Sequence, residues 1–263
     1  EQVLPLPDDL SGWSVPDDRW SAREGVLTGR TTADAPLERA SYAVWLGDLP
    51  DDFALTAEVR LDGGNSGLQF RSRVDAGGDL HGYQADLDAA HAYTGAVYHN
   101  DRGLLALRGQ AVVLDSDGGR SVESRGAPNA LGAAFRDGRW NTLRVTARGA
   151  RLEVSVNDVT TARLHDRAPG ASRSGSLALQ LHPGEPMAVS WRNVRVRALP
   201  PDLTDAPPAP AAWWVWSQSE AHDDEALILH RTVELPAAAA HAVWIGAGDN
   251  RLDMLLDGVH MAR

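Results

Sequence analysis

The stretch that decides the fold lies between residues 65 and 98 and consists of three short runs separated by turns. It reads Asn65-Ser66-Gly67-Leu68-Gln69-Phe70-Arg71, then Gly82-Tyr83-Gln84-Ala85-Asp86-Leu87-Asp88, then Thr94-Gly95-Ala96-Val97-Tyr98. In the first two runs large apolar residues alternate with polar ones, and residues two apart on a β-strand point to the same face. The alternation predicts two strands, each with one buried face. The other face carries amides, carboxylates and a guanidinium, groups that bind polyhydroxylated ligands and move protons on them.

Turn-forming residues recur about every ten residues along the chain, as in Asp62-Gly63-Gly64 and Asp117-Gly118-Gly119. Short alternating segments lie between these turns. Such spacing favours an all-β sandwich or barrel of antiparallel strands. We expect strands at residues 53–61, 141–146, 151–156, 176–182 and 188–197, and one short helix within residues 127–135.

A change of composition near residue 199 predicts a domain boundary. Residues 199–212 are rich in Pro and Ala, which is typical of a stiff, extended linker. We therefore expect a first β domain over residues 1–198 and a second β unit over residues 213–263. Because the second unit is short for an independent domain, we expect the rest of it to lie outside this sequence.

The composition excludes several classes of function. The formal net charge is -11, and an acidic chain is a poor partner for nucleic acid, which requires a basic surface. There is no cysteine, so disulfides, thiolate nucleophiles and zinc–thiolate sites are excluded. No apolar run approaches the roughly 20 residues that span a membrane. The chain begins Glu1-Gln2 without Met, and we expect an exported bacterial protein, periplasmic, cell-surface or secreted.

The order of several motifs is more specific than any one of them. The motifs are Ser11-Gly12-Trp13, Gly64-Asn65-Ser66-Gly67-Leu68-Gln69-Phe70-Arg71, Gly82-Tyr83-Gln84-Ala85-Asp86, Thr94-Gly95-Ala96-Val97-Tyr98, Gly138-Arg139-Trp140-Asn141-Thr142, Leu177-Ala178-Leu179-Gln180-Leu181-His182 and Trp191-Arg192-Asn193-Val194-Arg195-Val196. Over about residues 5–198 the chain resembles the 3-keto-disaccharide hydrolase domain family, also described as 3-keto-glucoside 1,2-lyase/3-keto-2-hydroxyglucal hydratase. The resemblance implies a concanavalin-like jelly-roll β-sandwich. The segment after the linker is loosely similar to the opening strands of a galactose-binding-like domain.

The resemblance also implies an elimination route for breaking a glycosidic bond. A sugar oxidised to a ketone at carbon 3 has an acidified proton on carbon 2. A base removes that proton, and the resulting enolate expels the group on carbon 1, with or without later addition of water. The route needs a general base, a stabiliser for the enolate oxygen and an acid for the leaving oxygen.

The candidate site residues lie mostly on the strand faces opposite the core. Asp86 and His182 are the leading acid–base candidates, because carboxylate and imidazole titrate in the useful pH range. Arg71 is the candidate for holding the enolate. The substrate-binding candidates are Glu58, Gln69, Gln84, Gln180, Asp88 and Arg108, with Glu58 also a second choice of base.

Each candidate has a structural alternative. The polar residues also fit solvated sheet positions with cross-strand pairs such as Glu58 with Arg71, and Arg108 also fits a purely structural pairing. The sequence identifies no cofactor with certainty. A divalent cation held by Asp86, Asp88 or His182 would polarise the ketone, although no tight metal-ligand spacing is visible.

Two classes of function fit these observations, and jelly rolls serve both. The first is an enzyme that cleaves 3-keto-glycosides, with a glycoside or oligosaccharide as its partner. The second is a non-catalytic carbohydrate-binding or adhesion module of a larger surface protein. The acid–base groups in the polar cluster favour the enzyme. An ordinary retaining glycosidase is a weaker third candidate, because no Glu-x-Asp-x-x-Glu strand is present.

Overall fold

The computed structural model describes residues 2–200, 202, 254–256 and 259–262. The chain divides into two units, Glu1–Asp205 and Ala206–Arg263. The described part of the second unit is an antiparallel pair of short strands, β18 (Met254–Leu256) and β19 (Val259–Ala262). The predicted linker over residues 199–212 and the predicted galactose-binding-like domain over 213–263 fall almost wholly outside the described residues and stay predictions.

The described strands of the first unit form two sheets. The ten-stranded sheet has the order β12-β11-β15-β14-β13-β6-β17-β4-β3, with β1 paired to β17. Its strands are β1 (Gln2–Val3), β3 (Trp20–Arg23), β4 (Val26–Arg30), β6 (Phe53–Asp62), β11 (Gln110–Leu114), β12 (Arg120–Ser124), β13 (Asn141–Arg148), β14 (Arg151–Val156), β15 (Val159–Asp166) and β17 (Ala188–Ala198). The pairing of β11 with β15 is parallel, whereas the other described pairs are antiparallel.

The seven-stranded sheet has the order β10-β9-β8-β7-β16-β5-β2. Its strands are β2 (Trp13–Ser14), β5 (Ser41–Trp45), β7 (Asn65–Val74), β8 (Leu80–Asp88), β9 (Val97–His99), β10 (Gly103–Ala106) and β16 (Ser176–Leu181). The short helix α1 (Pro128–Gly132) packs near β15. The expected strands begin at the expected residues and end within two residues of their predicted ends, and α1 lies inside the segment predicted to be helical.

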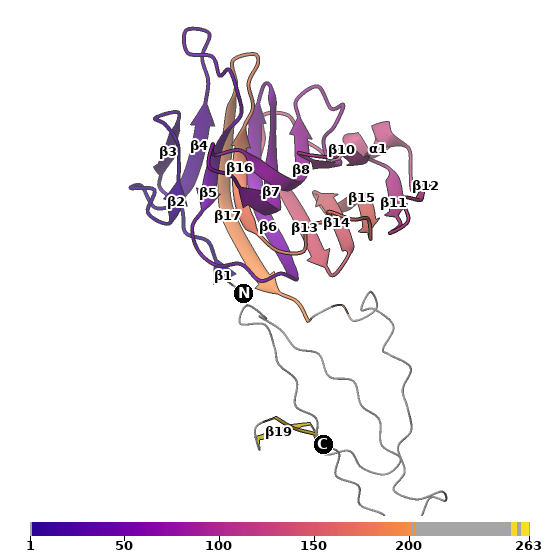
Figure 1. Cartoon of the computed structure of the whole chain (residues 1–263). Coiled ribbons are helices and arrows are strands. Elements are labelled where there is room, and N and C mark those ends of the chain that lie inside the picture. Colours follow the sequence, from indigo (N-terminus) through magenta and orange to yellow (C-terminus); the bar gives the residue numbers. More distant parts are fainter. Residues whose placement is uncertain (1, 201, 203–253, 257–258, 263) are drawn as a thin grey trace, which may run out of the picture. The chain divides into compact units, whose positions relative to one another are not determined.

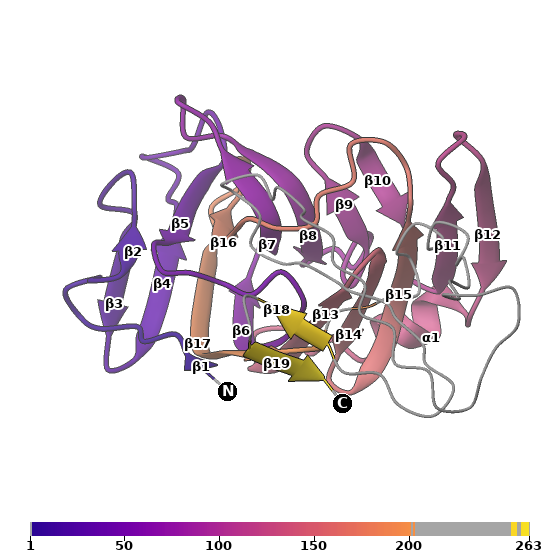
Figure 2. The same cartoon turned by 60° about the horizontal axis from the view of Figure 1, so that its bottom comes forward.

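The two sheets lie face to face (Figures 1 and 2). Buried apolar side chains from both sheets form the main core cluster. The seven-stranded sheet contributes Leu68, Phe70 and Tyr83, and the ten-stranded sheet contributes Leu143 and Trp191, all fully buried. Leu68, Phe70 and Tyr83 come from the alternating positions that the sequence assigned to the buried face. The predicted all-β jelly-roll sandwich is therefore confirmed.

Arg71 departs from the predicted alternation. Its φ is 48°, in the left-handed region, and the register of β7 against β8 shifts between Phe70 and Arg73. Such a bulge adds a residue to one strand and turns the following side chains. The Arg71 side chain is therefore not beside Gln69, and its placement on the polar outer face was wrong.

The Arg71 guanidinium instead bonds the loop between β5 and β6 to the turn between β13 and β14. It donates to the carbonyl of Asp51 at 2.7 and 2.9 Å, to the carbonyl of Gly149 at 2.7 Å and to Oδ1 of Asp52 at 2.9 Å. Asp51 and Asp52 precede β6, and Gly149 forms the turn between β13 and β14. The side chain is 1% exposed, so these bonds are sheltered from water and hold the sheets together at one end.

Glu58 also lies apart from the polar cluster of the smaller sheet. It is in β6 of the ten-stranded sheet, where it accepts hydrogen bonds from Arg192 at 2.7 Å and from Asn193 at 2.8 Å. The suggested cross-strand pair of Glu58 with Arg71 was wrong, because the two residues belong to different sheets.

We predict that Arg71→Met lowers the free energy of unfolding by about 3 kcal/mol, because the carbonyls of Asp51 and Gly149 and Oδ1 of Asp52 lose the buried guanidinium that donates to them. Urea unfolding followed by far-ultraviolet circular dichroism measures this loss. The matched control is Arg23→Met, whose side chain is 86% exposed, with an expected change within about 0.5 kcal/mol. Equal stability of the two variants would show that the Arg71 bonds do not hold the turns.

Candidate functional site

A cavity of about 710 Å³ opens on the outer face of the seven-stranded sheet. Its polar lining residues are Asn65, Gln84, Asp86, Asp88, Asn100, Gln180 and His182. The remaining lining residues are Ala40, Tyr42, Tyr93, Tyr98, Leu104 and Pro183. Five residues that the sequence singled out, from β8 and from the end of β16, thus come together in one hollow.

The strand register explains why these side chains meet. Gln84 of β8 lies opposite Tyr98 of β9 and opposite Gln69 of β7. Gln180 of β16 lies opposite Tyr42 of β5. Because cross-strand partners point to the same face, rows of side chains run across neighbouring strands and form the floor of the cavity.

A chain of hydrogen bonds with one direction runs along this floor. Ser72 Oγ donates to Gln69 Oε1 at 3.0 Å, and Gln69 Nε2 donates to Gln84 Oε1 at 2.9 Å. Gln84 Nε2 then donates to Asp86 Oδ1 at 3.1 Å. Each amide accepts from one neighbour and donates to the next, so the orientation of both amides is fixed and the chain ends on the Asp86 carboxylate.

Gly67 makes room for this chain. It lies opposite Asp86 in the register of β7 and β8. A Cβ at residue 67 would stand 2.4 Å from Cδ of Gln84, which is shorter than any van der Waals contact. The absence of a side chain on Gly67 therefore lets Gln84 lie across β7 and reach the carboxylate.

Asp86 carries the most strongly perturbed carboxyl group of the cavity. Burial raises its pKa to about 6, although hydrogen bonds from Gln84 and Asn65 act in the opposite direction. Its three donors, Gln84, Asn65 and the amide of Leu87, all bond to Oδ1, and Oδ2 accepts no bond from the described residues. Asp86 thus presents an oxygen with the basicity of a general base near neutral pH.

His182 has a defined tautomer when neutral. Its Nδ1 lies 2.6 Å from the carbonyl of Pro183, and a carbonyl accepts only from a protonated ring nitrogen. Nε2 is therefore the acceptor of the neutral ring.

Gln180 adds a buried Oε1 with no hydrogen-bond partner among the described residues. An orphaned acceptor in a cavity lining is a position where a ligand hydroxyl completes the hydrogen bonding.

Besides Glu58, which lies in the other sheet, two more of the predicted substrate-binding residues do not line the cavity. Gln69 is fully buried beneath Gln84 and donates a second bond to Asn100 at 2.9 Å. Arg108 is 6% exposed and bonds the carbonyls of His91, Thr94 and Pro128, at 2.7 to 2.8 Å. Arg108 therefore has the structural pairing that was its alternative reading, and both residues orient their neighbours.

The cavity also contains residues that the sequence did not single out. Asn65 lies on the same face of β7 as Gln69, so alternation was a sufficient signal for it. Tyr42 and Leu104 come from strands that were not predicted to border the polar cluster, and Tyr93 lies in the loop after β8, where no periodicity exists to follow.

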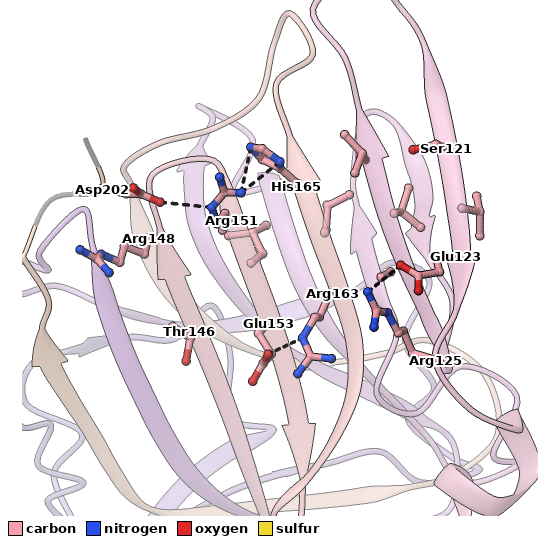
Figure 3. A pocket seen from close by; sticks show the side chains of 16 residues that line it. Ser121, Glu123, Arg125, Thr146, Arg148, Arg151, Glu153, Arg163, His165 and Asp202 are labelled. Atoms are coloured by element: carbon pink, nitrogen blue, oxygen red, sulfur yellow. Dashed lines mark hydrogen bonds and ion pairs between the residues drawn. The ribbon is translucent and has the colours of Figure 1, made fainter. Parts of the chain in front are cut away.

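A second hollow of about 750 Å³ lies on the outer face of the ten-stranded sheet (Figure 3). Its carboxylates are bonded to arginines, Glu153 to Arg163 at 2.7 Å, Glu123 to Arg125 at 2.6 Å and Asp202 to Arg151 at 3.4 Å. Paired side chains of this kind offer no base that is separated from a cation. We therefore place the candidate site in the cavity around Asp86.

Within the part of the chain that the structure describes, no three His, Asp or Glu side chains are grouped so that they would hold a metal ion. A divalent cation at Asp86, Asp88 or His182 stays a prediction.

No helix among the described residues has the length and apolar character needed to cross a bilayer. Export of the protein from a bacterial cell also stays a prediction.

Several solved structures are similar to this chain. A carbohydrate-binding module from Bacillus subtilis is 20% identical, with a TM-score of 0.49, and the match covers 74% of this chain and 100% of that one. A protein of unknown function with a galectin-like fold, also from Bacillus subtilis, is 13% identical, with a TM-score of 0.47 and coverage of 74% and 94%. An alginate lyase of polysaccharide lyase family 7 is 10% identical, with a TM-score of 0.42 and coverage of 74% and 98%. Likenesses this distant do not decide between an enzyme and a binding module.

None of the curated proteins compared with the chain is similar to it. The family comparison, in contrast, covers almost the whole first unit. Residues 6–197 match the model of the 3-keto-alpha-glucoside-1,2-lyase-like domain. This span contains the seven-stranded sheet, the ten-stranded sheet except β1 and the last residue of β17, and every residue lining the cavity around Asp86. The chain therefore belongs to the 3-keto-alpha-glucoside-1,2-lyase-like domain family.

Proposed function

We propose that the protein cleaves 3-keto-glycosides by removing the proton on carbon 2, with Asp86 as the general base. The observation that carries the proposal is a carboxylate buried in a cavity with its pKa raised to about 6, in the same lining as an imidazole. A carboxyl with this pKa is ionised at neutral pH and is a stronger base than an exposed aspartate. The 3-keto group supplies the acidified proton that such a base can remove.

The proposed step conserves atoms and charge. The proton on carbon 2 moves to Asp86, and the electron pair of that bond forms the enolate of the 3-ketone. The enolate re-forms the ketone while the bond between carbon 1 and its oxygen breaks, and the leaving oxygen takes a proton from the His182 imidazolium. The products are an unsaturated keto sugar and the free aglycone alcohol, and later addition of water gives net hydrolysis.

Arg71 is not available to hold the enolate oxygen, because its guanidinium is bonded to turns of the other sheet. Tyr42 and Gln180 are the proposed donors in its place. Burial raises the pKa of the Tyr42 hydroxyl, so it stays protonated and able to donate. The amide of Gln180 lies 3.4 Å from this hydroxyl, which puts an N–H and an O–H donor side by side.

A carbohydrate-binding module is the second candidate function. Tyr93 is 46% exposed in the cavity lining, next to several amides, and binding modules use such aromatic platforms with amides. In this case the protein would bind plain glycans saturably and would release no aglycone from a 3-keto-glycoside. The two candidates are thus separated by turnover.

We predict that Asp86→Asn lowers kcat on a 3-keto-glucoside by about a hundredfold or more, because the amide cannot accept the proton. His182→Ala is expected to lower kcat as well, through loss of the acid. Release of the aglycone, measured by chromatography, reports both. The matched control is Asp117→Asn, in an exposed turn, with an expected kcat near that of the unaltered protein. Full turnover by Asp86→Asn would remove the assignment of the base.

We predict an acid limb in the pH profile of kcat/KM with a midpoint near pH 6. Below this pH the Asp86 carboxyl is protonated in the free enzyme, and the rate falls about tenfold per pH unit. Initial rates across a buffer series measure the midpoint. The residual activity of His182→Ala is expected to keep the same limb, because the limb belongs to Asp86. A midpoint near pH 4, typical of an ordinary aspartate, would contradict a buried base.

We predict that Asp86→Asn stabilises the fold at pH 8 by roughly 3 kcal/mol. The folded carboxyl has a pKa of about 6 against a model value of 3.8, so ionising it costs folding free energy. That cost is absent below about pH 4 and fully present above about pH 6, so the gain from the amide disappears in acid. Urea unfolding at the two pH values measures it, with Asp117→Asn as control. A gain that is equal at both pH values would have another cause.

A further inference from the structure

The cavity around Asp86 has two chemically different sides. Its carboxylates, its imidazole and most of its amides come from β7, β8 and the end of β16. Tyr98 of β9 and Leu104 of β10 lie beyond them, and these two residues are cross-strand partners. Tyr98 is in turn opposite Gln84 of β8. Along the row of cross-strand partners Gln84, Tyr98 and Leu104, the lining therefore changes from a polar floor to an aromatic and aliphatic wall.

Tyr93, from the loop between β8 and β9, is a further aromatic residue in the lining of the same cavity. With 46% of its surface exposed, it is among the most exposed large hydrophobic residues of the described chain, although it is in the lining of the cavity. A half-exposed tyrosine ring at a cavity mouth keeps a free face on which a flat or apolar group can pack.

We propose that Tyr93, Tyr98 and Leu104 form the leaving-group subsite, and that it favours glycosides with an aromatic aglycone over those with a hydroxyl-rich one. The inference rests on the proposed function, because it takes the keto sugar to be the occupant of the polar side. A second sugar would need acceptors and donors around its hydroxyls, and the side chains of Tyr93, Tyr98 and Leu104 offer only two phenol hydroxyls. The lining amide that follows Tyr98, Asn100, already accepts a hydrogen bond from Gln69 at 2.9 Å. An aromatic ring buries apolar area against the wall and needs no such partners.

Two buried charged residues hold Tyr93 in place. Asp88, at the end of β8, accepts hydrogen bonds from the amides of Ala90 at 2.9 Å, Ala92 at 3.0 Å and Tyr93 at 3.4 Å. This carboxylate satisfies backbone donors that no strand partner reaches. The Tyr93 backbone is thereby anchored at the rim of the cavity.

Arg108 fixes the other side of the same loop. It donates to the carbonyl of His91 at 2.7 Å and to the carbonyl of Thr94 at 2.8 Å, on either side of Tyr93. Asp88 and Arg108 were both expected to bind substrate. In this proposal they are positioning residues, which act on the substrate through the loop that carries Tyr93.

The test compares benzyl and methyl 3-keto-glucosides. Both release a simple alcohol, so their ratio of kcat/KM reports aglycone binding more than leaving-group chemistry. We expect the unaltered protein to prefer the benzyl compound, and Tyr93→Ala to lower that preference about fivefold. Tyr93→Phe keeps the ring and is expected to restore the preference. The matched control is Val122→Ala, half-exposed on β12 and outside this cavity.

Asp88→Asn tests the positioning role. It keeps one acceptor oxygen and is expected to raise KM for the benzyl compound with little change in kcat, as an effect on aglycone binding requires. A purely structural role would lower the amount of folded protein and leave the benzyl-to-methyl ratio unchanged. A ratio near one in the unaltered protein, or a ratio that Tyr93→Ala does not change, would overturn the inference.

Failure of the proposed function gives a different result. If neither 3-keto-glucoside is turned over, the function is wrong, and calorimetry with benzyl and methyl glucosides then tests the subsite alone. Tighter binding of the benzyl compound that is lost in Tyr93→Ala supports the subsite. Equal affinities for the two compounds contradict it.

Discussion

Burial of the Asp86 carboxylate at the end of a chain of aligned hydrogen bonds is the constraint on which the site depends. Water would solvate an exposed aspartate and leave it a weak base, whereas the cavity raises its pKa to about 6. The cost of this burial is offset by donors that all arrive at one oxygen, Oδ1. The second oxygen is left for chemistry.

The rest of the smaller sheet serves this arrangement. The chain from Ser72 through Gln69 and Gln84 needs three residues on one face at the spacing of adjacent strands, which antiparallel pairing of β7 with β8 provides. Gly67 has no side chain, and this leaves the space in which the Gln84 side chain lies across β7. On the opposite face Leu68 and Tyr83 pack into the core and keep the strands in register.

Buried arginines in this fold hold loops and turns. Arg71 donates hydrogen bonds to carbonyls in the loop before β6 and in the turn between β13 and β14. Arg108 donates to the carbonyls on either side of Tyr93. Turn carbonyls have no strand partner, and a guanidinium with five donors satisfies several of them at once. Arginine is therefore a poor marker of a ligand contact here, and the candidate donors to an oxyanion are the neutral groups of Tyr42 and Gln180.

The alternation of residues 65–88 was sufficient to predict two strands, their buried faces and the polar side that carries Gln69, Gln84 and Asp86. It failed at Arg71, because a single left-handed residue resets the alternation and a local pattern does not reveal it. It also failed at Glu58, because alternation assigns a face and does not say to which sheet the strand belongs.

By itself the sequence determined the all-β class, the family and the side of each strand that is polar, since these follow from a two-residue period and from motifs in fixed order. Only the tertiary structure decided which polar residues share a cavity, how deeply Asp86 is buried and where Tyr93 stands. Those properties arise from contacts between segments far apart in the chain, such as the row from β10 to β5 and the anchoring of one loop by Arg108, and no local pattern encodes them.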